Sequence, residues 1–141
     1  MRIPFHVPQF WWSLAAAGVV VLAACTALSS AEPEEPKLRL RASPHVAFAG
    51  DSVLFIAELR DGDDDYRELY CVTVEWDWDD GTRSESTPDC DPYEPGVSKI
   101  RRRYSTRHAF RDGGQHRVRL YLKQRDDIVA SVTQSIEVRL R

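Results

Sequence analysis

An acidic loop is the part of this sequence best suited to ion chemistry. The run Asp61–Asp65 reads D-G-D-D-D, and crowded carboxylate oxygens are the ligands that calcium prefers in proteins. The calcium loop of helix–loop–helix proteins, however, would need glycine where Tyr66 stands and glutamate where Val72 stands. We therefore expect a solvated acidic loop, with no cofactor and no dedicated metal site. Its weak candidate ligands are Asp61, Asp63 and Asp65.

A basic run lies further along the chain and could hold anions. It comprises Arg101, Arg102, Arg103 and Arg107. Guanidinium groups bind phosphates and carboxylates through paired hydrogen bonds, so these residues could contact lipid headgroups or an acidic partner. We expect them to be exposed and to have no structural task. Alternatively, the same charges would protect an edge strand from aggregation.

Charge and motifs limit the classes of function. The chain carries 19 Lys and Arg against 22 Asp and Glu, a formal net charge of −3, which argues against nucleic acid as a general partner. The sequence has no nucleophile beside a base in a recognisable context, no phosphate-cradling glycine loop and no paired-histidine zinc motif. We therefore predict a protein that is not an enzyme.

The amino terminus predicts export. Leu14–Ala24 is an uninterrupted apolar run of 11 residues, which fits the hydrophobic region of a secretory signal and is short for a membrane span. The run leads into Leu22-Ala23-Ala24-Cys25, which resembles the lipobox of bacterial lipoproteins. This resemblance implies a signal peptide over 1–24, cleavage before Cys25, and acyl chains such as palmitate on Cys25.

An uncleaved membrane anchor is the alternative, because Phe10–Trp12 lengthens the apolar stretch. Either interpretation places residues 26–141 outside the cytoplasm. In a cell with two membranes, Thr26 directly after the cysteine resembles the signal for delivery to the outer membrane. We therefore expect a lipid-anchored protein of the cell envelope.

The two remaining cysteines, Cys71 and Cys90, predict one disulfide. An even pair in an oxidising compartment is paired by default. Closing a loop of about 19 residues would stabilise the domain by about 3 kcal/mol in the chain-entropy model. Two ligands of a zinc site are the competing interpretation, but no histidine or further cysteine lies at the short spacing that zinc sites need.

Composition divides the exported part into a tether and one domain. Ser29–Pro36 is polar and proline-bearing with little to bury, so residues 25–36 are expected to form a lipidated, flexible tether. Residues 37–141 match the length of a single sandwich of about 100 residues. Apolar residues alternate along 53–59, 72–78 and 118–122, as half-buried strands require. The last strand is expected to bury Ile128, Ala130, Val132, Ile136, Val138 and Leu140.

Two short motifs indicate the fold. The first is Trp76-Asp77-Trp78-Asp79-Asp80-Gly81, and the second is His108-Ala109-Phe110 followed by Gly114 and Val118. Together they resemble the signature of the polycystic-kidney-disease (PKD) domain. The resemblance implies an all-β, immunoglobulin-like sandwich. It also implies structural roles for the matched residues: Trp76 in the core, Asp80 and Gly81 in a turn, and an ordered His108. His116 stands where the tyrosine of a tyrosine corner is found in such sandwiches.

The PKD family mostly comprises binding and spacing modules, so the resemblance implies a non-catalytic interaction or structural module of the cell envelope. Its partner would be an envelope protein or a glycan, in addition to the membrane reached through the lipid anchor. The alternatives are a calcium-stabilised adhesion or glycan-binding module, and an accessory subunit of an envelope enzyme or secretion complex.

Overall fold

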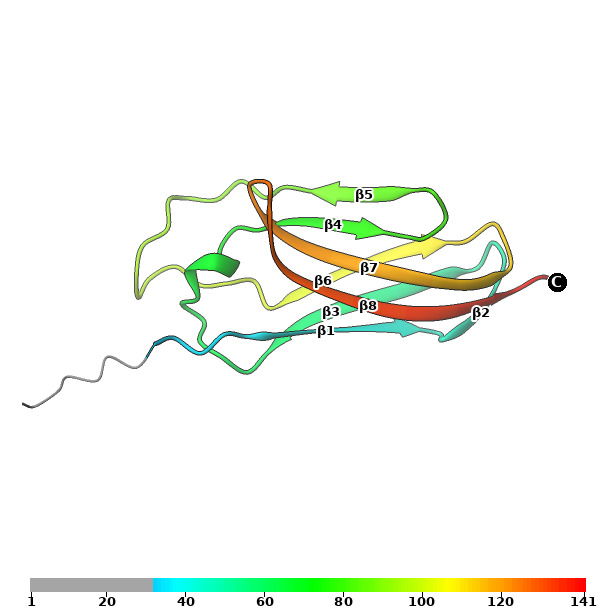
Figure 1. Cartoon of the computed structure of the whole chain (residues 1–141), viewed down its shortest axis with the longest axis horizontal. Helices are drawn as coiled ribbons and strands as arrows, with labels where there is room; N and C mark the ends of the chain where they lie inside the picture. Colours follow the sequence, from blue (N-terminus) through cyan, green and yellow to red (C-terminus); the bar gives the residue numbers. More distant parts are fainter. Residues whose placement is uncertain (1–31) are drawn as a thin grey trace, which may run out of the picture. The chain divides into compact units, whose positions relative to one another are not determined.

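Alternating apolar residues build two antiparallel sheets that pack face to face. The computed structural model describes residues 32–141 (Figure 1). The first sheet has the strand order β1-β3-β6, and the second has the order β2-β8-β7-β4-β5, in which only β2 and β8 run parallel. The predicted all-β sandwich is confirmed. Its elements are β1 (Lys37–Ser43), β2 (Val46–Phe48), β3 (Ser52–Arg60), the 3-10 turn η1 (Arg67–Leu69), β4 (Thr73–Asp77), β5 (Arg83–Ser86), β6 (Arg103–Ala109), β7 (Gly114–Gln124) and β8 (Asp127–Arg139).

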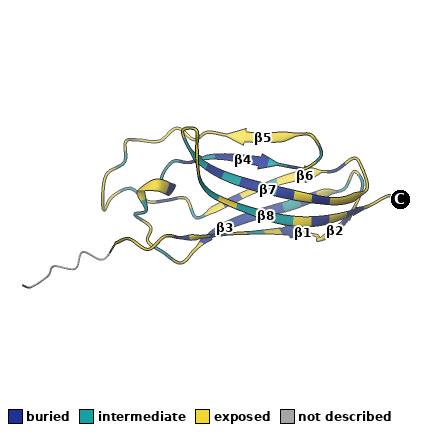
Figure 2. Ribbon diagram, in the orientation of Figure 1, coloured by how far each residue is buried: buried dark blue, intermediate teal, exposed yellow. Residues whose placement is uncertain are grey.

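The core lies between the inner faces of the two sheets, where Figure 2 shows the buried stripes of β3, β4 and β7. The odd-numbered residues of β3 from Val53 to Leu59 are buried, as the alternation predicts. Trp76 and Trp78 stack in parallel with ring centroids 5.4 Å apart, and Phe55 packs against both rings. Each such aromatic ring contributes on the order of 2–3 kcal/mol by its burial, so this cluster is central to the stability of the sandwich.

The prediction for the last strand is wrong at two positions. Ile128 and Leu140 are 56% and 70% exposed, whereas Ile136 and Val138 are buried. The pairing of β7 with β8 shifts at Leu122 and Lys123, so that β8 carries one extra residue. Because of the extra residue, the alternation of inward and outward side chains is out of step on the two sides of the bulge. Ile128 therefore lies opposite the outward-facing Lys123. Leu140 lies beyond the end of β8.

The end of the predicted tether is part of the fold. Pro36 is buried, and the backbone N–H of Glu34 donates to the Asp63 carboxylate at 2.9 Å. In return, the N–H of Asp63 donates to the Glu34 carbonyl at 3.0 Å. We call these two hydrogen bonds between Glu34 and Asp63, together with the neighbouring Gly62, the entry clasp. Residues 34–36 therefore do not belong to a flexible tether, while the predicted signal peptide and Cys25 lie outside the described residues.

Candidate interaction surface

The turn after β4 holds its shape through Asp80. The Asp80 carboxylate accepts the backbone N–H of Thr82 at 2.9 Å and contacts His108 Nε2 at 2.7 Å. Burial raises the pKa of Asp80, but the hydrogen bonds from Thr82 and His108 outweigh it and hold the pKa below its ordinary value. His108 also stacks on Trp78, with ring centroids 4.2 Å apart. The structure thus places His108 between a core ring and a turn carboxylate.

Asp79 and His116 close the neighbouring corner. Asp79 adopts a left-handed φ of 60°, which glycine most readily adopts, and Gly81 follows with a φ of 84°. The Asp79 carboxylate accepts the N–H of Arg117 at 2.8 Å, so the side chain fastens the turn to β7. His116 is buried, with its ring nitrogens 3.1 Å and 3.4 Å from the carbonyl oxygens of Asp112 and Asp79. These contacts give His116 the position that a corner tyrosine would fill.

Other matched residues of the motif also lie in the sandwich. Trp76, Phe110 and Val118 are buried in the core, and Gly114, at the start of β7, has a φ of 133°. The Asp77 carboxylate accepts the N–H of Asp79 at 3.1 Å and faces Arg83 on β5. The motif therefore supplies packing and turn geometry, and it leaves the outer surfaces of the sheets to interact with other molecules.

The acidic loop is exposed at Asp61, Asp63 and Asp64, as expected from the sequence, but several of its groups also have partners within the protein. Arg102 reaches into it: its guanidinium donates to the carbonyls of Asp61 and Gly62 at 2.7 Å and 2.9 Å and forms an ion pair with Asp64. The Asp65 carboxylate accepts the Tyr93 hydroxyl and the N–H of Gly96. These two bonds, that from Tyr93 foremost, lower the pKa of Asp65. Arg102 therefore has a structural task, which the sequence analysis missed.

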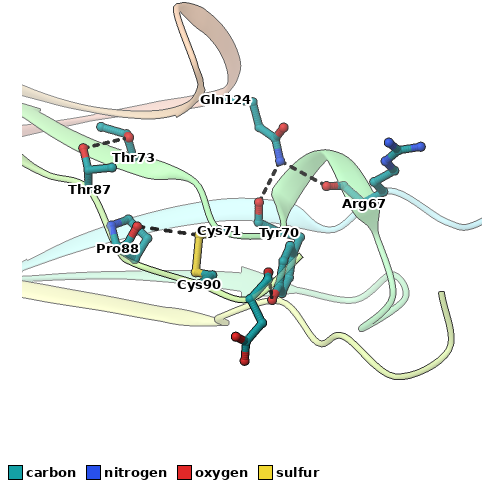
Figure 3. The surroundings of a disulfide bond; sticks show 9 residues. Arg67, Tyr70, Cys71, Thr73, Thr87, Pro88, Cys90 and Gln124 are labelled. Carbon is teal, nitrogen blue, oxygen red and sulfur yellow. Dashed lines mark hydrogen bonds between the residues drawn. A yellow bond between two sulfur atoms is a disulfide. The ribbon is translucent and has the colours of Figure 1, made fainter. Parts of the chain in front are cut away.

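The disulfide between Cys71 and Cys90 is present, with Cα atoms 6.1 Å apart (Figure 3). Cys71 precedes β4 with a left-handed φ of 55°, so the bridge fastens the turn after η1 to the long connection that follows β5. Gln124 supports the same turn, because its side-chain amide donates to the carbonyls of Tyr70 and Arg67. Disulfides persist in oxidising compartments, which agrees with the predicted export.

Most of the charged residues on the outer face of the sheet β1-β3-β6 are positive. Strand register places Arg39 and Arg103 on either side of Glu58, Lys37 beside Arg60, and Arg107 beside Leu54. Glu58 is the sole carboxylate at the outward-facing positions of these three strands. We call this surface the arginine face. Its cations are Lys37, Arg39, Arg41, Arg60, Arg103 and Arg107.

Glu58 sits at the centre of the arginine face and is shared by three guanidinium groups. It forms ion pairs with Arg60, with Arg103 at 3.2 Å and with Arg41 at 3.7 Å. The hydrogen bond from Arg60 chiefly lowers the pKa of Glu58, against an opposing effect of burial, and the three positive charges add to the lowering. Lys37, Arg39 and Arg107 form no ion pair with any residue from 32 to 141, so positive charge remains in surplus.

A shallow groove of about 520 Å³ runs along the arginine face. Arg39, Arg41 and Arg60 line it together with Leu40, Ile56 and the two acidic residues Glu58 and Asp61. The second sheet differs, since on the outer side of β4, β5 and β7 it pairs carboxylates with cations: Glu75 with Arg83 and Lys123, and Asp77 with Arg83 and Arg119. The two outer faces therefore differ in whether their cations have partners.

The predicted basic run is divided by the fold. Arg103 and Arg107 belong to the arginine face, whereas Arg102 points into the acidic loop. Arg101 precedes β6 and lies over the Tyr104 ring at 5.2 Å. Lys37, Arg39, Arg41 and Arg60 were not among the candidate residues predicted from the sequence. The alternation K-L-R-L-R over 37–41 is the signal that could have placed the first three on one face of a strand.

Two further observations concern the described part of the chain. Between residues 32 and 141, no three acidic, histidine or cysteine side chains come together as a metal site would require. Over the same residues, no helix has the length and apolar character of a membrane span.

A family model for the PKD domain matches residues 37–139. The chain belongs to the PKD domain family. The match begins at the first residue of β1 and ends at the last residue of β8, so it covers both sheets of the sandwich. The motif residues that hold the turn and the core are thus those of a PKD domain, and the coarse functional class is a β-sandwich binding or interaction module.

Solved structures share the β-sandwich fold at low identity. One comes from work on the promiscuous specificity of carbohydrate-binding modules of the β-sandwich superfamily; it is 18% identical over 76% of this chain, with a TM-score of 0.49. This PKD chain spans about a third of that structure, 35% of its length. A CARDB domain from Pyrococcus furiosus, solved with di-metal ions, is 12% identical over 77% of this chain and 97% of its own, with a TM-score of 0.45.

A superoxide reductase from Ignicoccus hospitalis is 13% identical, with a TM-score of 0.40, over 80% of this chain and 86% of its own. No curated protein matches the chain. These structural likenesses show the fold alone.

Proposed function

We propose that this chain is a non-catalytic, lipid-anchored interaction module of the bacterial cell envelope, and that the arginine face is its binding surface. The observation that carries the proposal is the surplus of cations on that face. Six cations share one carboxylate there, although residues 32–141 carry 18 Lys and Arg against 22 Asp and Glu, a net charge of −4. Charge segregated in this way favours an anionic partner.

The occupied motif residues support a role without catalysis. Asp80, His108 and His116 are titratable residues of the family motif, and each is engaged in packing or in fastening a turn. A general acid or base must reach a substrate, whereas these side chains face the sandwich interior or its turns. The motif thus supports a scaffold that presents its surfaces.

The acidic loop gives less support to the calcium-dependent alternative. The carboxylates of Asp63, Asp64 and Asp65 already accept hydrogen bonds or ion pairs from the protein itself. A calcium ion would need six to eight oxygen ligands and would have to displace these partners. The alternative of an accessory subunit of an envelope enzyme or secretion complex fits the same surface and differs from the first proposal in its partner alone.

The lipid anchor is tested by labelling cells with a radioactive fatty acid. We expect the wild-type chain to take the label and Cys25→Ala to accumulate as an unlabelled precursor, because acyl transfer needs the thiol of Cys25. Ser29→Ala serves as the control, since it lies beyond the lipobox and should label as the wild type does. A wild-type chain without label would refute the anchor while leaving the binding surface untested by this experiment.

The binding surface is tested by photo-crosslinking in living cells. A photoreactive residue at Ser105 would lie on β6 between Arg103 and Arg107 of the arginine face, and one at Ser135 would lie on β8 in the other sheet. We expect specific adducts from position 105 that disappear when Arg39, Arg41 and Arg107 are changed to glutamine. Adducts from position 135 alone would move the interaction to the second sheet.

A further inference from the structure

The cations of the arginine face are spread in two dimensions. They come from all three strands, which lie about 4.8 Å apart, and residues on one face repeat about every 6.8 Å along a strand. Positive charge therefore covers a patch roughly 10 Å by 20 Å. A patch of this shape matches a planar array of anions better than it matches a single extended chain.

The chemistry of the face favours small anions over sugar rings. Its outward-facing positions hold Lys, Arg, Glu, Ser, Ala, Leu and Ile, and no aromatic residue occupies any of them. Glycan-binding sites use aromatic rings as platforms, whereas guanidinium groups match the geometry of phosphate oxygens. Ile56 on this face is only 8% exposed, so binding would depend on charge with little apolar contact.

The chain enters the domain beside this face. The tether leads into β1, which is an edge strand of the same sheet, and the entry clasp fixes residues 34–36 at that point. Eleven residues lie between Cys25 and Lys37, so a lipid on Cys25 would hold the face within about 40 Å of the bilayer. The acidic loop lies at the entry, where an anionic surface would repel it, and this favours a side-on orientation with the arginine face toward the membrane.

From this arrangement we infer that the arginine face docks on the phosphate headgroups of an anionic phospholipid bilayer. The inference rests on the proposed function, in that it names the partner of the same surface. Lys37, Arg39 and Arg107, which have no ion partner among residues 32–141, would contact headgroup phosphates directly. Arg41, Arg60 and Arg103 would share them with Glu58.

The test uses residues 32–141, which contain every residue of the core and both cysteines of the disulfide. A cooperative thermal transition first verifies that each variant folds. Binding is then measured by flotation with vesicles of phosphatidylglycerol and phosphatidylcholine, with pure phosphatidylcholine vesicles in parallel. Because Cys25 is absent, a failure of the lipid anchor cannot affect the result.

We expect binding to the anionic vesicles that weakens as salt is added, and none to pure phosphatidylcholine. The triple variant Arg39→Gln, Arg41→Gln and Arg107→Gln should bind on the order of a hundredfold more weakly. The matched control changes three exposed arginines outside the face, Arg111, Arg117 and Arg125, to glutamine and so alters net charge equally. It should bind within about threefold of the wild type, because its charges lie away from the docked surface.

Three results would overturn the inference. The first is a folded wild-type domain that ignores anionic vesicles. The second is an equal loss in the two triple variants, which would mean that net charge and not the face governs binding. The third is tight binding of a soluble anionic polysaccharide without vesicle binding, which would assign the face to a glycan instead.

Discussion

Arg102 and Arg107 have different roles although they are close in sequence. Arg102 contacts the carbonyls of Leu59, Asp61 and Gly62 and the Asp64 carboxylate, and its side chain is 33% exposed. Arg107 is exposed and has no ion pair within residues 32–141. A partly buried guanidinium that satisfies several backbone carbonyls stabilises a loop, whereas an exposed one contributes little to stability.

Arg102→Gln should therefore reduce the free energy of unfolding by about 1–2 kcal/mol, because glutamine cannot reach all the acceptors that Arg102 satisfies. Arg107→Gln should change it by less than about 0.5 kcal/mol. Urea denaturation at neutral pH measures both values. Equal effects of the two substitutions would mean that the contacts of Arg102 do not hold the loop.

At the scale of elements, sequence periodicity predicted most of the sandwich. The alternation along β3, β4 and β7 placed Val53, Trp76 and Leu120 correctly in the core, because a strand buried on one face permits little else. The bulge between β7 and β8 could not be predicted, since one extra residue leaves no mark in the pattern of either strand. Long-range charge partners, such as Arg41 and Arg103 around Glu58, depend on register and were missed for that reason.

The contribution of the entry clasp to stability can be tested by comparing Gly62 with Gly96. A Cβ at Gly62 would lie 2.5 Å from the Pro36 nitrogen and 2.6 Å from the Glu34 carbonyl oxygen, whereas a Cβ at Gly96 would meet nothing within 4 Å. Both glycines have left-handed φ angles, 60° and 73°, so alanine carries a similar backbone cost at each. The difference between the two substitutions therefore reports the clash with the clasp.

Gly62→Ala should destabilise the domain by at least about 1 kcal/mol more than Gly96→Ala, since backbone atoms cannot move aside without opening the clasp. Urea denaturation gives the difference. Amide hydrogen exchange at Asp63 should accelerate in Gly62→Ala alone, because its N–H loses the Glu34 carbonyl. Unchanged exchange at Asp63 would show that the clasp tolerates a side chain.

For the whole molecule, we expect stability to decrease at both acidic and alkaline pH. The carboxyl groups of Glu58, Asp65 and Asp80 have pKa values below their ordinary values of 4.5, 3.8 and 3.8. Their contribution is complete above those ordinary values and is lost as the pH falls through the lowered folded-state values. Burial raises the pKa of Tyr104 from 10.0 to about 12, so its contribution is complete below 10.0 and is lost as the pH rises toward 12.

The free energy of unfolding should therefore be flat near neutral pH, fall below about pH 4 and fall again above about pH 10. Urea denaturation across this range measures the profile. Tyr104→Phe should remove part of the alkaline fall and cost little at neutral pH, because the buried Tyr104 hydroxyl has no hydrogen-bond partner among the described residues. An alkaline arm unchanged by Tyr104→Phe would assign it to other groups.

The entry clasp also bears on where this domain can be cut for recombinant expression. The family match begins at Lys37, so a fragment chosen by that boundary would discard Glu34 and Pro36. The Asp63 N–H and carboxylate would then lose their partners. Arg102, which donates hydrogen bonds to the same loop, would then contact a less ordered segment. A fragment that begins at Glu32 retains the clasp, and it should resist limited proteolysis at the 61–65 loop better than one that begins at Lys37.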